Sequence, residues 1–296
     1  MSPMTVLLIY CTLIVLASLA GGFLPGLLQL THTRMQILMS FVGGLMLGVA
    51  VLYMLPHALA ELENIQHVTL SLLGGLLVMF FLIRIFHVHQ HGAPDDPHVH
   101  EEHTHDPLVS SAEDCHLHQH RLSWIGLALG LGLHTILDGV ALAASVMAGS
   151  HAETPGILLG IGAFAAIVLH KPLDALSITS VMRAGGWSSR TTLAVNTGFA
   201  LMCPLGALAF YLGAGSELGS HQTLVGLALA AAAGIFLCIA LADILPELRF
   251  HSHDRLKLSV ALLLGVLLAY AVGQLEPHHS HGSHHHHPPA ENVSPS

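Results

Sequence analysis

The sequence predicts an all-α integral membrane protein with eight transmembrane helices. Of its 296 residues, 53% are hydrophobic and only 9% are charged, an imbalance that a single soluble core of this size could not hide. A helix needs about 20 apolar residues to cross a bilayer core of about 30 Å. The stretches that qualify are residues 4–28, 36–58, 68–86, 122–147, 156–182, 191–213, 222–247 and 257–275.

The first span is predicted to be retained rather than cleaved. No Lys or Arg precedes its apolar run, whereas a secretory signal begins with basic residues. Three of the four cysteines, Cys11, Cys203 and Cys238, lie within apolar runs. A disulfide framework is therefore not expected.

Lys and Arg residues set the predicted orientation. When the loops are assigned alternately to two sides, the cations outside the spans all fall on one side: Arg34, Arg84, Arg121, Arg183, Arg190, Arg249, Arg255 and Lys257. Cytoplasmic loops carry the excess of Lys and Arg, so both termini are expected on the extracytoplasmic side. The expected location is the cell membrane, the inner membrane in a bacterium. The oligomeric state stays open, with a homodimer among the alternatives.

The overall charge favours a metal cation as partner and argues against nucleic acid. Eighteen Asp and Glu outnumber nine Lys and Arg, whereas nucleic-acid binding rewards clustered positive charge. The chain also contains 26 His, and neutral imidazole is the commonest metal ligand. The lipid bilayer and a metal ion are the partners that this composition predicts.

A histidine-rich segment separates the third and fourth spans and sets the domain organisation. It is rich in Asp and Glu as well, a composition typical of disorder, and we expect it to buffer metal weakly on the cytoplasmic side. The predicted regions are residues 1–86 with spans one to three, 87–121 as the His-rich loop, 122–182 with spans four and five, 183–276 with spans six to eight, and 277–296 as a His- and Pro-rich extracytoplasmic tail.

An internal repeat appears when the chain is shifted by 190 positions. Gly44, Leu47 and Ala50 then align with Gly234, Leu237 and Ala240, and spans one to three align with spans six to eight. Aligned spans cross the membrane in opposite directions, as in the inverted repeats of transporters. The sequence therefore predicts a 3+2+3 architecture in which spans four and five form a central inverted pair.

The central pair carries two matched motifs, His134-x-x-x-Asp138 and His170-x-x-x-Asp174. Residues four apart share one face of a helix, so two adjacent helices could surround one ion with two imidazoles and two carboxylates, a zinc-type ligand set. Each ionisable group near the bilayer centre costs about 2.5–3.5 kcal/mol, which a bound cation would offset. Hydrogen bonding between helices is the alternative interpretation.

Two further pairs of residues lie at the ends of helices and could relay an ion. Asp243 and Glu247 stand four apart at the cytoplasmic end of the seventh span. His57 and Glu61 stand four apart at the outer end of the second. Solvated helix-end residues are the alternative interpretation of both pairs.

Together these features resemble the ZIP (Zrt/Irt-like) family of metal transporters over all eight spans. The resemblance rests on the His-rich loop, on His134-x-x-x-Asp138-Gly, on the Pro-containing fifth span and on Gly234-Ile-Phe-Leu through Asp243-x-x-Pro246-Glu247. It implies a transporter that moves metal toward the cytosol with His134, Asp138, His170 and Asp174 as the principal site. Zinc is the leading substrate, with iron, manganese and cadmium as alternatives.

The chain departs from the family pattern at the metal site. Thr135 and Lys171 stand where the family often has Asn and an acid, so a second metal would lose two ligands. We therefore expect a single ion, with the Lys171 ammonium in the electrostatic place of a second metal and paired with Asp138 or Asp174. Asn196 resembles the asparagine of the family's sixth span and is an auxiliary candidate.

Two other classes remain as alternatives to this non-enzymatic transporter. A cation-diffusion-facilitator exporter also uses His and Asp four apart, but on non-adjacent helices of six. An intramembrane zinc hydrolase would need an open coordination position to activate water. The sequence has no Gly-x-x-x-x-Gly-Lys-Ser/Thr loop for a nucleotide, so transport is expected to proceed without nucleotide hydrolysis.

Overall fold

The computed structural model describes residues 2–27, 32–86, 110–149, 158–215, 221–250 and 255–275. Within these ranges every regular element is a helix, and eight are long and apolar enough to cross a membrane, which confirms the predicted fold class. The elements are α1 (Pro3–Leu27), α2 (His32–Val49), η1 (Ala50–Met54), α3 (Leu55–Leu62), α4 (Ile65–Phe86), α5 (Ser110–Gly149), α6 (Ile161–Ala184), α7 (Ser189–Gly215), α8 (His221–Phe250) and α9 (Arg255–Gly273).

The second predicted span consists of three consecutive elements, α2, the π-helical turn η1 and α3. The turn places Tyr53 and Met54 in the interior, where they are 3% and 0% exposed. Pro56 follows within the first turn of α3, where a missing backbone N–H is tolerated. The span ends at Glu63, which adopts a left-handed conformation with φ of 50°.

The helix that contains the fourth span begins earlier than the apolar pattern predicts, although its candidate apolar span begins at Ala128. The apolar run begins near residue 122, but α5 begins at Ser110, so the last part of the predicted His-rich loop is helical. A helix extends cheaply once it is nucleated, because each added residue gains a backbone hydrogen bond. The rest of that loop, residues 87–109, and the tail predicted over 277–296 lie outside the described residues.

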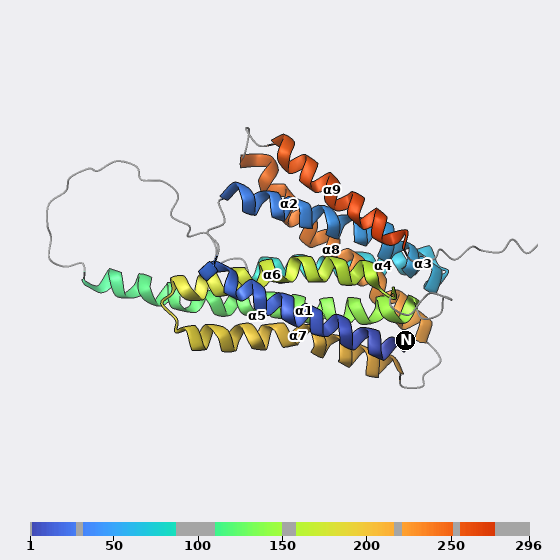
Figure 1. The fold of residues 1–296 in the computed structure, drawn as a ribbon, viewed down its shortest axis with the longest axis horizontal. Coiled ribbons are helices and arrows are strands. Elements are labelled where there is room, and N and C mark those ends of the chain that lie inside the picture. Colours follow the sequence, from blue (N-terminus) through green and yellow to red (C-terminus); the bar gives the residue numbers. More distant parts are fainter. Residues whose placement is uncertain are drawn as a thin grey trace, which may run out of the picture.

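The helices form two bundles (Figure 1). One contains α1, α5, α6 and α7, in which α5 packs along α7 and α1 along α6. The other contains α2, η1, α3, α4, α8 and α9, in which α2 packs along α9 and α4 along α8. We refer to them as the central bundle and the flanking bundle. The central bundle includes α5 and α6, which carry the two His-x-x-x-Asp motifs.

Glycine contacts in the flanking bundle follow the 190-residue repeat. Gly44 lies against the backbone of Leu262, and Gly234 lies against that of Leu72. Shifting the first pair by 190 positions along the chain gives the second, with the roles of the two copies exchanged. Gly75 with Ala231 and Gly265 with Phe41 form another such set. The repeat is therefore a property of the packing, and the predicted 3+2+3 architecture is confirmed.

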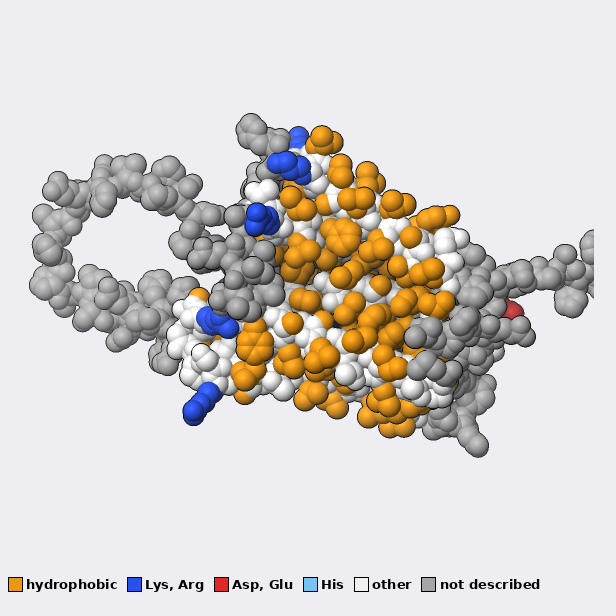
Figure 2. Space-filling model, viewed as in Figure 1, with side chains coloured by type: hydrophobic (Ala, Val, Ile, Leu, Met, Phe, Trp, Pro, Cys, Tyr) orange, Lys and Arg blue, Asp and Glu red, His pale blue; other side chains and the backbone are white. Residues whose placement is uncertain are grey.

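The eight spans alternate in direction, so the repeat is inverted (Figure 1). Spans related by the repeat are five apart in order, and an odd separation reverses their direction. Lys and Arg side chains gather at one end of the face drawn in Figure 2, while the middle of that face is apolar. This distribution is typical of a protein whose belt of apolar side chains meets lipid.

We expect Gly75→Ala to destabilise the protein and Gly74→Ala to leave it unchanged or slightly more stable. A Cβ at residue 75 would fall on the backbone of Ala231, whereas a Cβ at residue 74 meets nothing within 4 Å. Overpacking typically costs about 1–3 kcal/mol, and helical glycine is disfavoured relative to alanine. Thermal unfolding of the purified variants measures both effects, and equal melting temperatures would contradict the close packing of α4 on α8.

Candidate metal centre

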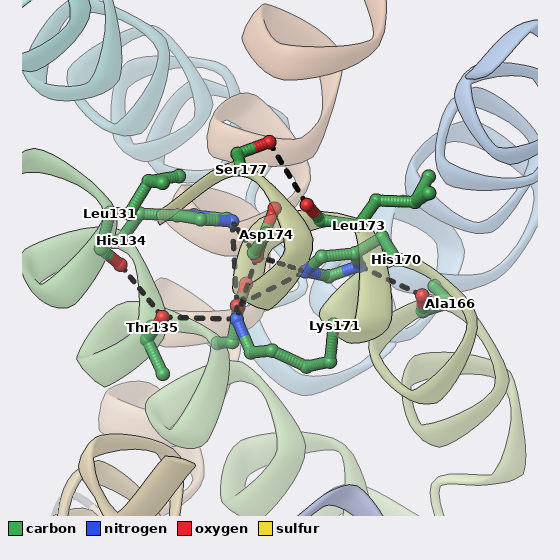
Figure 3. Close-up of polar contacts among 10 residues, drawn as sticks. Leu131, His134, Thr135, Ala166, His170, Lys171, Leu173, Asp174 and Ser177 are labelled. Carbon is green, nitrogen blue, oxygen red and sulfur yellow. Dashed lines mark hydrogen bonds and ion pairs between the residues drawn. The ribbon is translucent and has the colours of Figure 1, made fainter. Parts of the chain in front are cut away.

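The four residues of the paired motifs meet between α5 and α6 (Figure 3). His134 and Asp138 come from α5, and His170 and Asp174 come from α6. The spacing of four places both side chains of each helix on one face, and the two faces point toward each other. One ligand atom from each residue lies within 4.8 Å of all the others. We call these four residues the His/Asp cluster.

Four distances between imidazole nitrogens and carboxylate oxygens of the cluster are close to those around a tetrahedral zinc ion. The Nε2 atoms of His134 and His170 lie 3.4 and 3.2 Å from Oδ2 of Asp138, and 3.9 and 3.7 Å from Oδ2 of Asp174. Zinc bonds of about 2.0–2.2 Å place tetrahedral ligand atoms about 3.3–3.6 Å apart. A zinc-sized ion therefore needs only small movements of these side chains.

The cluster lies inside the protein and is most open at one carboxylate. The side chain of Asp138 is 0% exposed and those of His134 and His170 are 3% and 5% exposed, whereas that of Asp174 is 16% exposed. Burial raises the strength of each charge interaction and removes the water that would otherwise compete for an ion. An ion could therefore reach or leave the cluster past Asp174, the most exposed of the four side chains.

One backbone hydrogen bond orients the His170 ring. Its Nδ1 lies 2.8 Å from the carbonyl oxygen of Ala166, one turn earlier in α6. When Nδ1 carries the proton and donates to this carbonyl, the lone pair of Nε2 faces the two carboxylates. Metal-binding histidines commonly use their second nitrogen in this way, so this hydrogen bond is compatible with a metal ligand at His170.

Lys171 lies at the centre of the charges and is 1% exposed. Its ammonium pairs with Asp138 and also lies 3.2 Å from Oδ2 of Asp174. It donates to Oγ1 of Thr135 over 3.1 Å, and Thr135 in turn donates to the carbonyl oxygen of Leu131. Lys171 thus pairs with both carboxylates, whereas the sequence left open which of the two it would contact. Thr135 is a partner of the ammonium.

Comparison with known proteins agrees with this geometry. The family model described as "ZIP Zinc transporter" matches residues 4–273. The chain belongs to the ZIP zinc transporter family. Its function is the transport of a divalent metal ion across a membrane, and the suspected resemblance to this family is confirmed.

Similar proteins come from vertebrates. "Zinc transporter ZIP9-B" of Xenopus laevis is 26% identical over 289 residues, which cover 82% of this chain and 87% of that protein. "Zinc transporter ZIP9" of Macaca fascicularis is 33% identical over 47% of this chain and 63% of its own length. "Metal cation symporter ZIP14" of Mus musculus is 34% identical over 43% of this chain and 23% of its own length.

Asn196 and the outer relay candidates of this ZIP protein are not part of the His/Asp cluster. Asn196 of α7 lines a separate pocket with residues of α1 and α6. His57 is half-buried on α3, where Nδ1 lies 2.8 Å from the carbonyl oxygen of Tyr53, and Glu61 follows one turn later. Asp243 and Glu247 lie in α8, but their side chains are outside the described part of the structure. Both relays therefore stay predictions.

The sequence did not indicate two neighbours of this ZIP site. The ring of Phe199 in α7 lies 5.5 Å from Nζ of Lys171, a cation–π contact. The ring of Phe236 in α8 meets the ring of His170 edge to face, with the ring centroids 6.3 Å apart. Both contacts join helices far apart in the sequence, and an apolar or aromatic residue within a span gives no signal of its partner.

Proposed function

We propose that the His/Asp cluster is the transported-ion site and that it carries one divalent ion at a time toward the cytosol. The observation that carries this proposal is the meeting of two imidazoles and two carboxylates, from two inverted helices, at zinc-like distances inside one bundle. Four protein ligands complete a tetrahedral zinc site. Zinc is the substrate in the names of the ZIP9 relatives, which supports it as the leading substrate here. Iron, manganese and cadmium are the alternative substrates.

The central bundle is the unit that we expect to carry the ion. The resemblance to the family implies that the fourth and fifth spans move with the ion against the other helices. In the structure, Gly139 of α5 lies against the backbone of Cys203 in α7, and Gly21 of α1 lies against that of Pro172 in α6. Such close backbone contacts hold α1 and α7 to the central pair, so four helices move together in the alternating-access step. The inverted repeat provides two related arrangements for that step.

The ammonium of Lys171 explains how the metal-free site can change back to the arrangement that accepts a new ion. Two buried carboxylates with no partner would be costly inside the membrane. The ammonium pairs with both in the metal-free arrangement, which leaves a net charge of only −1 among these groups. The chain thus contains its own counter-cation, and this supports transport of a single ion without nucleotide hydrolysis.

The distribution of charge supports the direction of transport. Lys and Arg side chains gather at one end of the face drawn in Figure 2, and the positive-inside tendency favours that end as cytoplasmic. The acidic segments then lie outside, where they would concentrate cations. We propose this orientation, with both termini outside and the His-rich loop inside, for a protein of the cell membrane, the inner one in a bacterium.

The alternative functions fit the cluster less well. A hydrolytic zinc site keeps one position open for water, whereas here four protein ligands surround the space for the ion. The two motifs also lie on adjacent helices, unlike those of a cation-diffusion-facilitator exporter. Hydrolysis of a lipid amide by the purified protein would favour the enzyme.

Zinc uptake into proteoliposomes tests the proposal. We expect the native protein to take up zinc without nucleotide, and His134→Ala and Asp174→Ala to lower the initial rate at least about 100-fold, because each loses one of four ligands. His67→Ala is the control, because His67 is an exposed histidine of α4 outside both the cluster and the predicted relays. Equal uptake by the native protein and both cluster variants would overturn the assignment of the site.

A further inference from the structure

A second polar pocket lies in the central bundle, away from the His/Asp cluster. It has a volume of about 210 Å³ and lies among α1, α6 and α7. The polar groups around it come from Thr179 and Arg183 of α6 and from Ser189, Arg190, Thr192 and Asn196 of α7. Arg183 and Arg190 flank the turn between α6 and α7, so the pocket lies at the predicted cytoplasmic end.

The charge of this pocket favours an anion. Two arginines line it, and no acidic side chain of the described residues does. Arg183 donates from Nη2 to the carbonyl oxygen of Gly22 in α1 over 3.4 Å, which positions its guanidinium across two helices. A guanidinium has five N–H donors in a planar fork that matches phosphate oxygens. Donors remain for a ligand after the single bond to Gly22.

A buried amide provides a second, independent indication of a ligand. Asn196 is 2% exposed, and its Oδ1 is fully buried with no hydrogen-bond donor among the described residues. Its carboxamide packs against Gly22, which has no side chain to meet it. A buried polar atom left without a partner costs about 1–3 kcal/mol. A bound group that donates a hydrogen bond would offset this cost.

The start of α7 adds to the attraction for an anion. Ser188 caps the helix by accepting a hydrogen bond from the backbone N–H of Thr191 at 3.2 Å. Ser189 and Arg190 in the first turn both line the pocket. The free N–H groups and the dipole of a helix N-terminus favour negative charge. Two arginines, a helix start and an unsatisfied amide thus converge on one cavity.

We propose that this pocket binds a phosphate that has a hydroxyl of its own or belongs to a molecule with hydroxyl groups. Its oxygens would accept from Arg183 and Arg190, and a hydroxyl would donate to Oδ1 of Asn196 after a small movement of this side chain, because Oδ1 is fully buried in the structure. This phosphate could belong to the headgroup of an anionic phospholipid such as phosphatidylglycerol, or it could be free phosphate in the cytosol. The position at the end of the spans, where headgroups lie, suits the lipid. A bound phosphate would join α1, α6 and α7 and stabilise the bundle that carries the metal.

Binding to the purified full-length protein tests this proposal. Native mass spectrometry or thermophoresis would measure affinity for short-chain phosphatidylglycerol, phosphatidylcholine and inorganic phosphate. We expect Arg183→Gln with Arg190→Gln to weaken binding of the favoured phosphate at least about tenfold, the loss expected for one or more charge-assisted contacts. The variant Arg84→Gln with Arg255→Gln is the control. It also removes two positive charges from the predicted cytoplasmic end of the molecule, but in the flanking bundle and outside the pocket.

Each possible result of these binding measurements either assigns the ligand or overturns the proposal. Phosphatidylglycerol binding that is lost only in the pocket variant assigns the site to a lipid headgroup, and the same pattern with inorganic phosphate assigns it to a soluble ligand. Asn196→Asp, which keeps the side-chain size but adds a negative charge, should weaken either ligand similarly. Equal weakening by the pocket and control variants would show a general charge effect and overturn the proposal, as would unchanged binding in all variants.

Discussion

Replacing Lys171 with methionine is expected to lower the KM for zinc uptake at least about tenfold and to lower the maximal rate as well. The ammonium of Lys171 pairs with the same Asp138 and Asp174 oxygens that face the histidines. It therefore competes with the ion for both carboxylates. Methionine keeps an unbranched side chain of similar length and removes the competitor.

The charges of the cluster give the reason for the size of this effect. With Lys171 present, a divalent ion brings two carboxylates and one ammonium to a net charge of +1, whereas without it the loaded site is neutral. A unit charge close to a dication in a medium of low dielectric is worth several kcal/mol, of which about 1.4 kcal/mol suffices for a factor of ten. Tighter binding slows release, and the empty site loses its counter-cation, so turnover falls.

Initial uptake rates over a range of zinc concentrations measure both parameters. Lys257→Met, on the exposed surface of α9, controls for the loss of a lysine. We also expect zinc to raise the melting temperature of Lys171→Met more than that of the native protein, because its empty site is less stable. A higher KM in Lys171→Met than in the native protein would contradict the competition between ammonium and ion.

Asp138→Asn is expected to reduce zinc uptake at least about 100-fold. Oδ2 of Asp138 is the atom that the cluster shares, because it lies within 3.4 Å of both histidines and pairs with Lys171. Asparagine has nearly the same shape but no charge, so the loaded site would carry a net charge of +2 inside the membrane. That charge is costly to bury without a partner.

The matched control for Asp138→Asn lies two turns further along α5. Ser145 is also buried and its hydroxyl has no partner among the described residues, so Ser145→Ala removes a polar group from the same helix without touching the cluster. Uptake normalised to the amount of reconstituted protein compares the two variants. Similar rates for Asp138→Asn and the native protein would contradict the role of this carboxylate as a ligand.

Much of the fold was predictable because the membrane imposes simple rules on sequence. Spans show as apolar runs, and the 190-residue shift that aligns Gly44 with Gly234 also relates their contacts with Leu262 and Leu72. The His/Asp cluster was predictable for a similar reason. Ionisable residues are rare inside spans, and the spacing of four in adjacent helices determines which face they share.

Other features depend on contacts that the sequence does not contain. The π-helical turn before α3 contains the buried Tyr53, but no residue of the turn predicts a π-helix from the sequence. The division into two bundles follows from which helices pack together, so the fourth and fifth spans gave no sign that α1 and α7 belong with them. Asn196 was recognised as a resemblance, yet its surroundings come from α1 and α6.

An anomalous difference map at the zinc edge, from crystals of the full chain grown with zinc, tests the central claim most directly. We predict one intramembrane peak, within bonding distance of His134, Asp138, His170 and Asp174, and a second peak beside it only in Lys171→Glu. Two intramembrane peaks in the native protein, or a single peak that persists in a variant combining His134→Ala with Asp174→Ala, would contradict a single-ion site with Lys171 as its counter-cation.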